Sequence, residues 1–420
     1  MNYFETDFIC YKNNQLFVEN VSVEKLVREF GTPLYVYSRN HFINQYKKFE
    51  NSFKDVDSQI FFAVKSNFNL RVIDTFVKLG SGVDVNSEGE LFRALKTNVS
   101  PNKIILTGVG KTKKEIRLGI EKKVLMIKAE CEEEVELINK IASELNEIVS
   151  VAIRINPDVD SNSHPYISTG LSINKFGVNS DTALNIYRKR NQFANIRFTG
   201  IDMHIGSQIT SIEPFIEAIK KMSELYFILR NEGLDLEHFD IGGGFGVNYN
   251  SEKSFSIGDF ATKTIPLFKK LNCKILFEPG RFLTANGGVL ITEVLYNKQN
   301  GYKKFVIVDA AMNDLLRPSI YQAYHHIQPI IKYENRKDVI ADIVGPICES
   351  GDYFAKDREI SEVCSGEYLA IMSAGAYAMT MASTYNARRK APEILIDGDE
   401  IIVARSRETF EYMLWDENII

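Results

Sequence analysis

Short apolar runs alternate with amphipathic stretches along the middle of the chain, from about residue 58 to residue 282. The apolar runs are rich in β-branched and aromatic residues and have the length of buried strands. The stretches between them, such as Leu70 to Leu79 and Ile212 to Asn231, have the spacing of helices with one apolar face. Strands are predicted at about residues 60–66, 81–86, 103–108, 125–129, 149–155, 198–205, 237–242 and 274–279. This alternation predicts a parallel sheet with crossover helices.

Eight such strand and helix units can close into a TIM (β/α)8 barrel, although an open doubly wound sheet has the same alternation. Polar residues or glycines follow nearly every predicted strand. They are Lys65, Asp84 with Asn86, Thr107, Glu130, Arg154 with Asn156, His204 with Ser207, Gly242 to Gly244, and Glu278 with Arg281. Because a barrel builds its active site from the loops at one face, this distribution favours the barrel.

The pattern changes after Arg281. Apolar runs at residues 288–294, 304–309 and 393–397 predict strands with few long helices between them, which indicates a β-sandwich or β-barrel domain. Short strand-like pieces also occur between residues 8 and 36. We therefore expect a barrel domain at residues 37–282, a C-terminal β domain at residues 283–420, and an N-terminal segment, residues 1–36, that packs with the β domain.

Composition narrows the function classes. The chain has 420 residues and a formal net charge of -5, so it has no electrostatic affinity for nucleic acid or an anionic membrane. Its five cysteines are odd in number and lack the close spacing of a disulfide framework or zinc site, which indicates the reducing cytoplasm. The first residues include early acids and no long apolar core. We expect neither a secretory signal nor a membrane anchor there.

Three features of the sequence together indicate a cofactor site. Lys65 ends the apolar run Ile60 to Val64, where an isolated lysine would usually reach out to water. The glycines after Ile241 could bring backbone N–H groups to a phosphate, and Glu278 could face a ring nitrogen. An amine for a Schiff base, a phosphate cradle and such a carboxylate describe a pyridoxal phosphate site.

Each feature also has a purely structural interpretation. The three glycines could form only a tight turn, and Val247 breaks the Gly-x-Gly-x-x-Gly pattern of dinucleotide sites. His204 could be a hydrogen-bonded core residue, or it could stack on a cofactor ring while Ser207 reaches a phosphate. Glu278 and Arg281 could be a structural ion pair. The adjacent histidines at 325 and 326 have poor ligand spacing, so we expect no metal and interpret them as a polar surface or interface pair.

Several motifs in order resemble the fold type III pyridoxal phosphate decarboxylases, over nearly the whole chain. The motifs are Tyr35-Val36-Tyr37, Ala63-Val64-Lys65-Ser66-Asn67, His204-Ile205-Gly206-Ser207-Gln208, Gly242-Gly243-Gly244, Glu278-Pro279-Gly280-Arg281, Asp309 to Pro318, Cys348-Glu349-Ser350-Gly351-Asp352 and Ala374-Gly375-Ala376-Tyr377. Relatives of the ornithine type have Cys-Asp in place of Cys348-Glu349. This glutamate and the stretch Arg317 to Tyr321 therefore favour the members that act on diaminopimelate.

The resemblance implies the following roles. Lys65 would hold the cofactor covalently, His204 would stack on its ring, and Glu278 would pair with the ring nitrogen. Its phosphate would be held by Ser207, Gly243, Gly244 and backbone near Pro279, Gly280 and Arg281. Arg281, Arg317 and Tyr321 would bind the distal carboxylate of the substrate, and Glu349 its distal ammonium group. Tyr377 would contact cofactor and substrate, and Cys348 would deliver a proton to the carbon that loses carbon dioxide.

The expected function is thus the pyridoxal phosphate-dependent decarboxylation of meso-2,6-diaminopimelate to L-lysine, the last step of lysine biosynthesis. A related decarboxylase acting on ornithine, arginine or another D-amino acid would share Lys65 and the glycines. A non-catalytic pyridoxal-binding protein would have the barrel alone, and a scaffold protein would leave Lys65 and Glu278 unexplained. The resemblance also implies a homodimer in which the Cys348-Glu349 loop completes the site of the partner.

Overall fold

The computed structural model describes residues 3–160, 174–250 and 252–418. The chain divides into two compact units. The first comprises Met1–Asn44, Asn248–Glu252 and Leu283–Ile420, and the second comprises Gln45–Val247 and Lys253–Phe282. We call them the β unit and the barrel unit. No helix within the described ranges is long and apolar enough to cross a membrane.

The barrel unit contains eight parallel strands that close on themselves, as predicted. The strands are β5 (Ser58–Ala63), β6 (Gly82–Val85), β7 (Ile104–Leu106), β8 (Met126–Ala129), β9 (Val149–Arg154), β10 (Ile196–Asp202), β11 (His238–Asp240) and β12 (Lys274–Phe277). Closure occurs where β12 pairs in parallel with β5. The open doubly wound sheet is therefore excluded.

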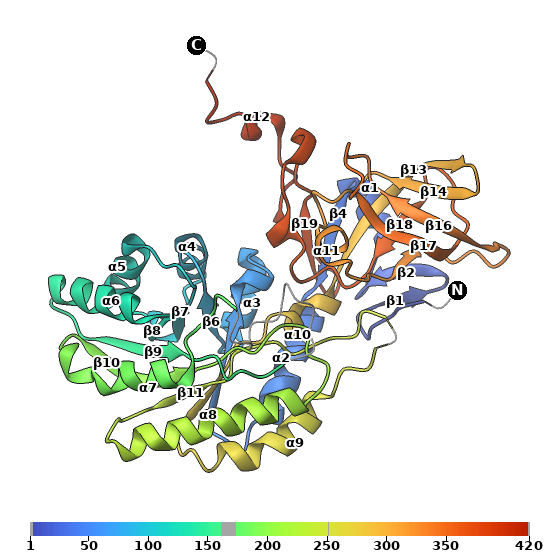
Figure 1. Cartoon of the computed structure of the whole chain (residues 1–420). Coiled ribbons are helices and arrows are strands. Elements are labelled where there is room, and N and C mark those ends of the chain that lie inside the picture. Colours follow the sequence, from blue (N-terminus) through green and yellow to red (C-terminus); the bar gives the residue numbers. More distant parts are fainter. Residues whose placement is uncertain (1–2, 161–173, 251, 419–420) are drawn as a thin grey trace. The chain divides into compact units, whose positions relative to one another are not determined.

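Helices connect these strands and cover the outside of the barrel (Figure 1). They are α3 (Leu70–Lys78), α4 (Glu88–Leu95), α5 (Lys113–Glu121), α6 (Glu132–Glu144), α7 (Ser180–Arg188), α8 (Glu213–Asn231) and α9 (Ile257–Phe268). Most begin at a side chain that satisfies a free N–H group of the first turn. In α5 the Thr112 and Glu115 side chains form a reciprocal capping box. The predicted helices at 70–79 and 212–231 correspond to α3 and α8.

The β unit is built on a nine-stranded sheet that joins both ends of the chain. Its strands are β4 (Leu34–Ser38), β13 (Gly288–Asn300), β14 (Lys303–Val308), β15 (Ile327–Pro329), β16 (Asp338–Val344), β17 (Tyr353–Ser361), β18 (Tyr368–Ile371), β19 (Glu393–Asp397) and β20 (Glu400–Arg405). Strand β4 pairs with β13 on one side and with β19 on the other. The N-terminal residues are thus an internal part of this sheet.

The first residues of the β unit form a small separate sheet of β1 (Ile9–Lys12), β2 (Gln15–Val18) and β3 (Val21–Ser22), followed by α1 (Val23–Phe30). Leu16, Val18 and Leu26 of this segment share one buried core with Val289 and Ile394. Helix α2 (Arg39–Ser52) leads toward the barrel strands, and the short helices α10 (Arg281–Thr284), α11 (Arg317–Tyr321) and α12 (Phe410–Met413) lie in the C-terminal half of the chain.

Candidate active site

The barrel interior changes from apolar to polar along its strands. Phe61, Ile105, Met126, Ala152 and Leu276 form a buried apolar cluster. Side chains two residues apart on a strand point to the same face, so the next interior layer toward the carboxyl ends is set by residues two positions further on. That layer contains Ala63, Thr107, Lys128, Arg154 and Glu278. Four of these five residues are polar, and they lie at the carboxyl ends of the strands, the face at which barrel enzymes build their active sites.

Lys65 lies just beyond β5. The prediction that the strand continues to residue 66 is wrong, because Val64–Ser66 forms a 3-10 turn. The Ser66 hydroxyl donates to the Ala63 carbonyl at 2.8 Å and the Asn67 N–H donates to the Val64 carbonyl at 3.0 Å, which turns the chain out of the sheet. The Lys65 side chain is 37% exposed, and its amine therefore lies at the mouth of the barrel.

Asp84 is the buried carboxylate beside this amine. Its Oδ2 lies 3.5 Å from Lys65 Nζ, and its Oδ1 accepts a 2.5 Å hydrogen bond from the Thr107 hydroxyl. Burial alone would raise the pKa of Asp84, but the charges of Lys65 and Lys128 and the Thr107 hydrogen bond outweigh it and lower that pKa. Asp84 is therefore ionised and attracts the Lys65 ammonium group.

The loop after β12 lies against the turn that carries Lys65. A Cβ added to Gly280 would lie 2.8 Å from Ser66 Cβ, so only glycine permits this approach without a shift. The Pro279 carbonyl accepts from the Ala63 N–H at 3.4 Å. Arg281, which is 6% exposed, donates from Nη2 to Ser207 Oγ at 2.9 Å. The sequence motifs that contain Lys65, Ser207 and Arg281 are thus brought together in one place.

His204 and the glycine triplet also meet. The N–H of Gly243 donates to His204 Nδ1 at 3.1 Å, which fixes the ring orientation. Gly242 and Gly244 have φ values of +69° and +97°, and a Cβ on Gly243 would overlap the Glu278 carbonyl oxygen. Burial, followed by the charges of Lys65 and Arg154, lowers the pKa of His204 well below its usual value. The ring is therefore neutral and suited to stack on a flat partner.

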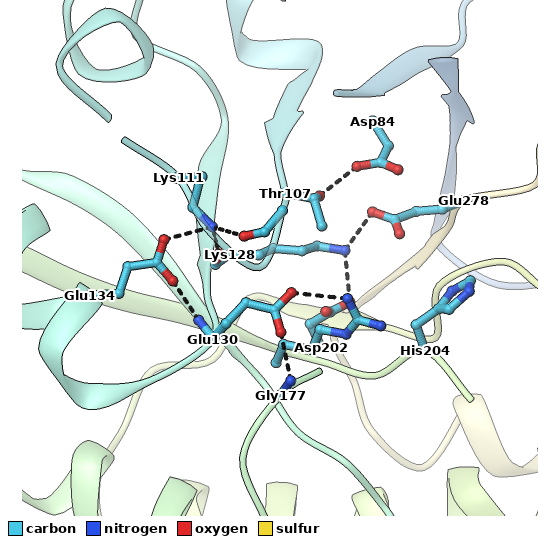
Figure 2. A network of polar contacts seen from close by, with 12 residues as sticks. Asp84, Thr107, Lys111, Lys128, Glu130, Glu134, Gly177, Asp202, His204 and Glu278 are labelled. Atoms are coloured by element: carbon cyan, nitrogen blue, oxygen red, sulfur yellow. Dashed lines mark hydrogen bonds and ion pairs between the residues drawn. The ribbon is translucent and has the colours of Figure 1, made fainter. Parts of the chain in front are cut away.

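A buried cluster of charges, which we call the Lys128 cluster, lies in the polar layer that contains Lys128 and Glu278. It consists of Lys128, Asp202, Asp240 and Glu278. Figure 2 shows the Lys128 side chain reaching to Glu278 through the interior. The alternative that Glu278 and Arg281 form a simple ion pair is wrong, because Glu278 pairs with Lys128 and Arg281 binds Ser207.

A second network lies at the ends of β8 and β9 (Figure 2). Arg154 Nη1 donates to Glu130 Oε1 at 3.0 Å, and the Gly177 N–H donates to Glu130 Oε2 at 2.6 Å. Lys111 Nζ is 2.8 Å from Glu134 Oε1 and also donates to the backbone carbonyl of Lys128. These contacts hold the strand-end residues Glu130 and Arg154 in place around the Lys128 cluster.

The remaining predicted site residues belong to the β unit. Arg317 begins α11 and is 5% exposed. Its Nη1 is 2.8 Å from His325 Nε2, and its guanidinium carbon lies 4.5 Å from the ring centre of Tyr249. His325 Nδ1 is 2.8 Å from the Met372 carbonyl oxygen. Because an arginine only donates and a carbonyl only accepts, His325 carries its proton on Nδ1 and accepts on Nε2.

The interpretation of His325 as a surface residue is therefore wrong. Its side chain is 0% exposed, and both ring nitrogens have partners, which makes this burial possible. His325 and Tyr249 position Arg317, and sequence reasoning missed both roles. The adjacent histidine pair was visible in the sequence, but its partners come from distant segments.

Helix α11 and the loop between β16 and β17 lie together. Ser319 Oγ donates to the Gly351 carbonyl at 2.6 Å. The Asp352 carboxylate accepts N–H groups from Met312 at 2.7 Å and Ile347 at 2.8 Å, which ties this loop to the segment before α11. Arg317 and Tyr321 on the helix, and Cys348 and Glu349 on the loop, are thus held in one region of the β unit. Cys348 and Glu349 are both exposed.

Tyr377 follows a segment of small residues and has an unusual backbone. Its φ of +54° lies in the left-handed region, which is rare for an aromatic residue and is maintained only where the surroundings impose it. The N–H groups of Ala374 and Gly375 donate to the carbonyls of Gly288 and Ala285 at 2.7 and 3.0 Å. These hydrogen bonds hold the segment before Tyr377 in place. The direction of the Tyr377 side chain is thus set by a backbone conformation that is unfavourable for an aromatic residue.

The barrel residues fit pyridoxal phosphate. Lys65 offers a primary amine, and the glycine triplet forms a loop without side chains, in which a Cβ at residue 243 would overlap the backbone. His204 offers a neutral ring whose orientation is fixed by the Gly243 N–H, and Glu278 offers a carboxyl group at the carboxyl ends of the strands. These are the kinds of group that suit the aldehyde, phosphate, ring face and ring nitrogen of that cofactor.

Comparisons with known proteins agree with this geometry. The family described as "Pyridoxal-dependent decarboxylase, pyridoxal binding domain" matches residues 39–285. The diaminopimelate decarboxylase of Aquifex aeolicus is 45% identical over 97% of this chain and 96% of its own length. The structure of diaminopimelate decarboxylase from M. jannaschii in co-complex with L-lysine has a TM-score of 0.94 at 36% identity, covering 99% of this chain and 98% of that one. The Helicobacter pylori enzyme complexed with L-lysine gives a TM-score of 0.90 at 40% identity, covering 93% and 98%.

Proposed function

We propose roles for the individual residues of this chain, which belongs to the diaminopimelate decarboxylase family of pyridoxal-dependent decarboxylases. It is a carboxy-lyase that converts meso-2,6-diaminopimelate to L-lysine and carbon dioxide with pyridoxal 5'-phosphate. This is the last step of lysine biosynthesis. The observation that carries the assignment of roles is the meeting of Lys65, His204, the glycine triplet and Glu278 at one face of the barrel.

The cofactor, when bound, supplies an electron sink for the electron pair left behind as the carboxylate departs. Lys65 would hold the cofactor covalently through its side-chain amine, a position for which the amine of the substrate can compete. Asp84 keeps the Lys65 side chain oriented before this exchange. His204 would cover one face of the ring, and Glu278 would pair with the ring nitrogen.

The phosphate would be held by Ser207, Gly243 and Gly244, and by the backbone around Pro279, Gly280 and Arg281. The hydrogen bond from Arg281 to Ser207 supports this role, because it fixes the serine hydroxyl beside a permanent positive charge. Several oriented N–H groups suit a phosphate better than a single cation does, since they also fix its direction.

The distal end of the substrate is bound by charged residues. Arg281, Arg317 and Tyr321 bind the distal carboxylate, Glu349 binds the distal ammonium group, and Tyr377 contacts cofactor and substrate. The Cys348 thiol donates its proton to the carbon that has lost carbon dioxide, which completes lysine. The buried Arg317, held by His325 at 2.8 Å, supports a bidentate role for its guanidinium group.

We also propose that the chain acts as a homodimer in the cytoplasm. All five cysteines lie in the described part of the chain and are free thiols, which suits a reducing compartment. The exposed Cys348-Glu349 loop suits a residue pair that completes the site of a partner subunit. Each half of the site would then come from a different chain.

A steady-state assay of carbon dioxide release tests the assignment. Meso-diaminopimelate should be turned over far faster than ornithine, arginine or lysine, because only it offers a distal carboxylate and a distal ammonium group together. Faster turnover of ornithine or arginine would instead support the related decarboxylases, which share Lys65 and the glycine triplet. Absorption of the purified protein in the visible range reports the bound cofactor independently.

A further inference from the structure

Lys128 is an unexpected residue in the centre of the barrel. It lies on β8, two positions after the apolar Met126, and its side chain is 0% exposed. Its Nζ lies 2.7 Å from Asp202 Oδ1, 2.7 Å from Asp240 Oδ2 and 2.5 Å from Glu278 Oε1. A fully buried lysine is rare and requires charged partners. The proposed reaction assigns a role to Glu278 but gives none to this lysine.

The lysine is the common partner of the three carboxylates. It donates hydrogen bonds to Asp202 and Glu278, while the Asp240 contact is an ion pair without hydrogen-bond geometry. The other oxygen of Asp240 accepts from the N–H of Gly242 at 2.8 Å, which links the Lys128 cluster to the glycine triplet. A change at Lys128 therefore reaches both Glu278 and this loop.

The charges in the cluster are unequal, with one ammonium group among three carboxylates. Burial, then Asp240 and Asp84, raises the pKa of Glu278 well above its usual value, and Lys128 opposes this rise. Burial by itself would lower the pKa of Lys128, but Asp202, Asp240 and Glu278 raise it well above its usual value. The lysine is therefore charged, and it is the main group favouring an ionised Glu278.

We infer that Lys128 is a positioning residue: it holds the Glu278 carboxyl group in place and favours its anionic form opposite the cofactor ring nitrogen. The inference rests on the proposed role of Glu278. Without Lys128, several buried carboxylates would face one another without a cation, and the pKa of Glu278 would rise further. A neutral carboxyl group gives less stabilisation to a protonated ring nitrogen than a carboxylate gives.

Cofactor binding to the cofactor-free protein provides a test that does not depend on turnover. The probes are pyridoxal phosphate and 1-deazapyridoxal phosphate, in which a C–H group replaces the ring nitrogen. The quantity is the ratio of their dissociation constants, which reports only the interaction with that nitrogen. The wild type should prefer pyridoxal phosphate, and Lys128→Met should reduce this preference by about tenfold or more.

Lys111→Met is the matched control, because Lys111 is also a buried lysine of this barrel. Its amine pairs with Glu134 and contacts the backbone carbonyl of Lys128, and its ion pair is not with Asp202, Asp240 or Glu278. This variant should keep the preference of the wild type. Glu278→Gln is the positive control and should lose most of the preference. If Glu278→Gln keeps it, the proposed role of Glu278 fails. If Glu278→Gln loses it and Lys128→Met keeps it, only the inference on Lys128 is overturned.

Lys128→Met could fold poorly, since it leaves three carboxylates without a cation. The double variant with Lys128→Met and Asp202→Asn removes one charge of each sign, and Asp202→Asn alone is its reference. The double variant should show a smaller preference for the ring nitrogen than this reference, by about tenfold or more. Equal preferences in these two proteins would also overturn the inference.

Discussion

Two buried carboxylic acids of this protein have opposite pKa shifts because their neighbours differ. Asp84 and Glu278 are both fully buried carboxylic acids of the barrel, yet the pKa of Asp84 is lowered and that of Glu278 is raised. Asp84 has Lys65, Lys128 and the Thr107 hydroxyl as favourable neighbours, whereas Glu278 faces Asp240 and Asp84 as well as Lys128. The set of neighbours decides the sign of the shift, and it cannot be read from the residue type.

Lys65→Ala should abolish the visible absorption of the bound cofactor and nearly all turnover. The substitution deletes the proposed covalent anchor but no core-filling group, since the side chain is 37% exposed. The thermal unfolding midpoint of the cofactor-free protein should stay close to that of the wild type. Turnover at the level of the wild type would refute the role of Lys65.

Glu349→Gln should weaken the use of diaminopimelate more than that of 2-aminopimelate, which lacks the distal ammonium group. The loss of a charge-assisted contact corresponds to about 1.5–3 kcal/mol in kcat/KM. Glu359→Gln removes another exposed carboxylate of the β unit and should leave both substrates unaffected. An equal loss for both substrates in Glu349→Gln would show that Glu349 does not bind that ammonium group.

Asp314→Asn should change the pH dependence of stability. Burial raises the pKa of Asp314 to about 7, despite a hydrogen bond from the Ala311 N–H. Because this folded-state pKa exceeds that of the unfolded chain, its stabilising contribution is complete at low pH and is lost as the pH rises through 7. From pH 5 to pH 8 the wild type should lose on the order of 2 kcal/mol relative to Asp314→Asn. Thermal unfolding of both proteins at the two pH values measures this difference.

At the scale of elements, the loops after the barrel strands do the positioning. The loop after β11 contains the glycine triplet, the loop after β12 contains Glu278 to Arg281, and the turn after β5 contains Lys65. Glycines at 243 and 280 let these three segments lie closer than side chains would permit. The site therefore depends on the absence of side chains at residues 243 and 280 as much as on the charged residues.

Gly243→Ala should lower the affinity for pyridoxal phosphate by about tenfold or more, because its Cβ would overlap the Glu278 carbonyl oxygen and displace both loops. Equilibrium dialysis with the cofactor measures this loss. Gly110→Ala is the control, since a Cβ at residue 110 would meet no atom within 4 Å. If both variants bind the cofactor as the wild type does, the tight approach of the two loops is not needed for binding.

At the scale of the whole molecule, the order of segments in the chain differs from their grouping in space. Strand β4 from the N-terminal part lies between β13 and β19, so the β unit contains segments from both halves of the chain. The residues proposed to act on one substrate are divided between the two units. Lys65 lies in the barrel unit, whereas Arg317, Cys348 and Glu349 lie in the β unit.

Heterodimers of Lys65→Ala and Cys348→Ala chains test the proposed dimer. Each homodimer should be nearly inactive, because every site lacks one of the two groups. After subunit exchange, each heterodimer should contain one intact site, with Lys65 from one chain and Cys348 from the other, and activity should return to about half that of the wild type per dimer. Verified heterodimers without recovered activity would place both residues in the same chain's site.

The sequence alone favoured a barrel over an open sheet, and it predicted the β-rich C-terminal part and the resemblance to the family, because strand periodicity and motif spacing are local properties of the chain. It also indicated Lys65, His204, the glycines, Glu278 and Arg281, since each follows a strand. It could not reveal the partners of Glu278 or the burial of His325. Lys128, Asp202 and Asp240 come from three strands and Glu278 directly follows a fourth, and only the folded barrel brings their charges within hydrogen-bond distance. Their protonation depends on that proximity and on the loss of water, which are properties of the tertiary structure alone.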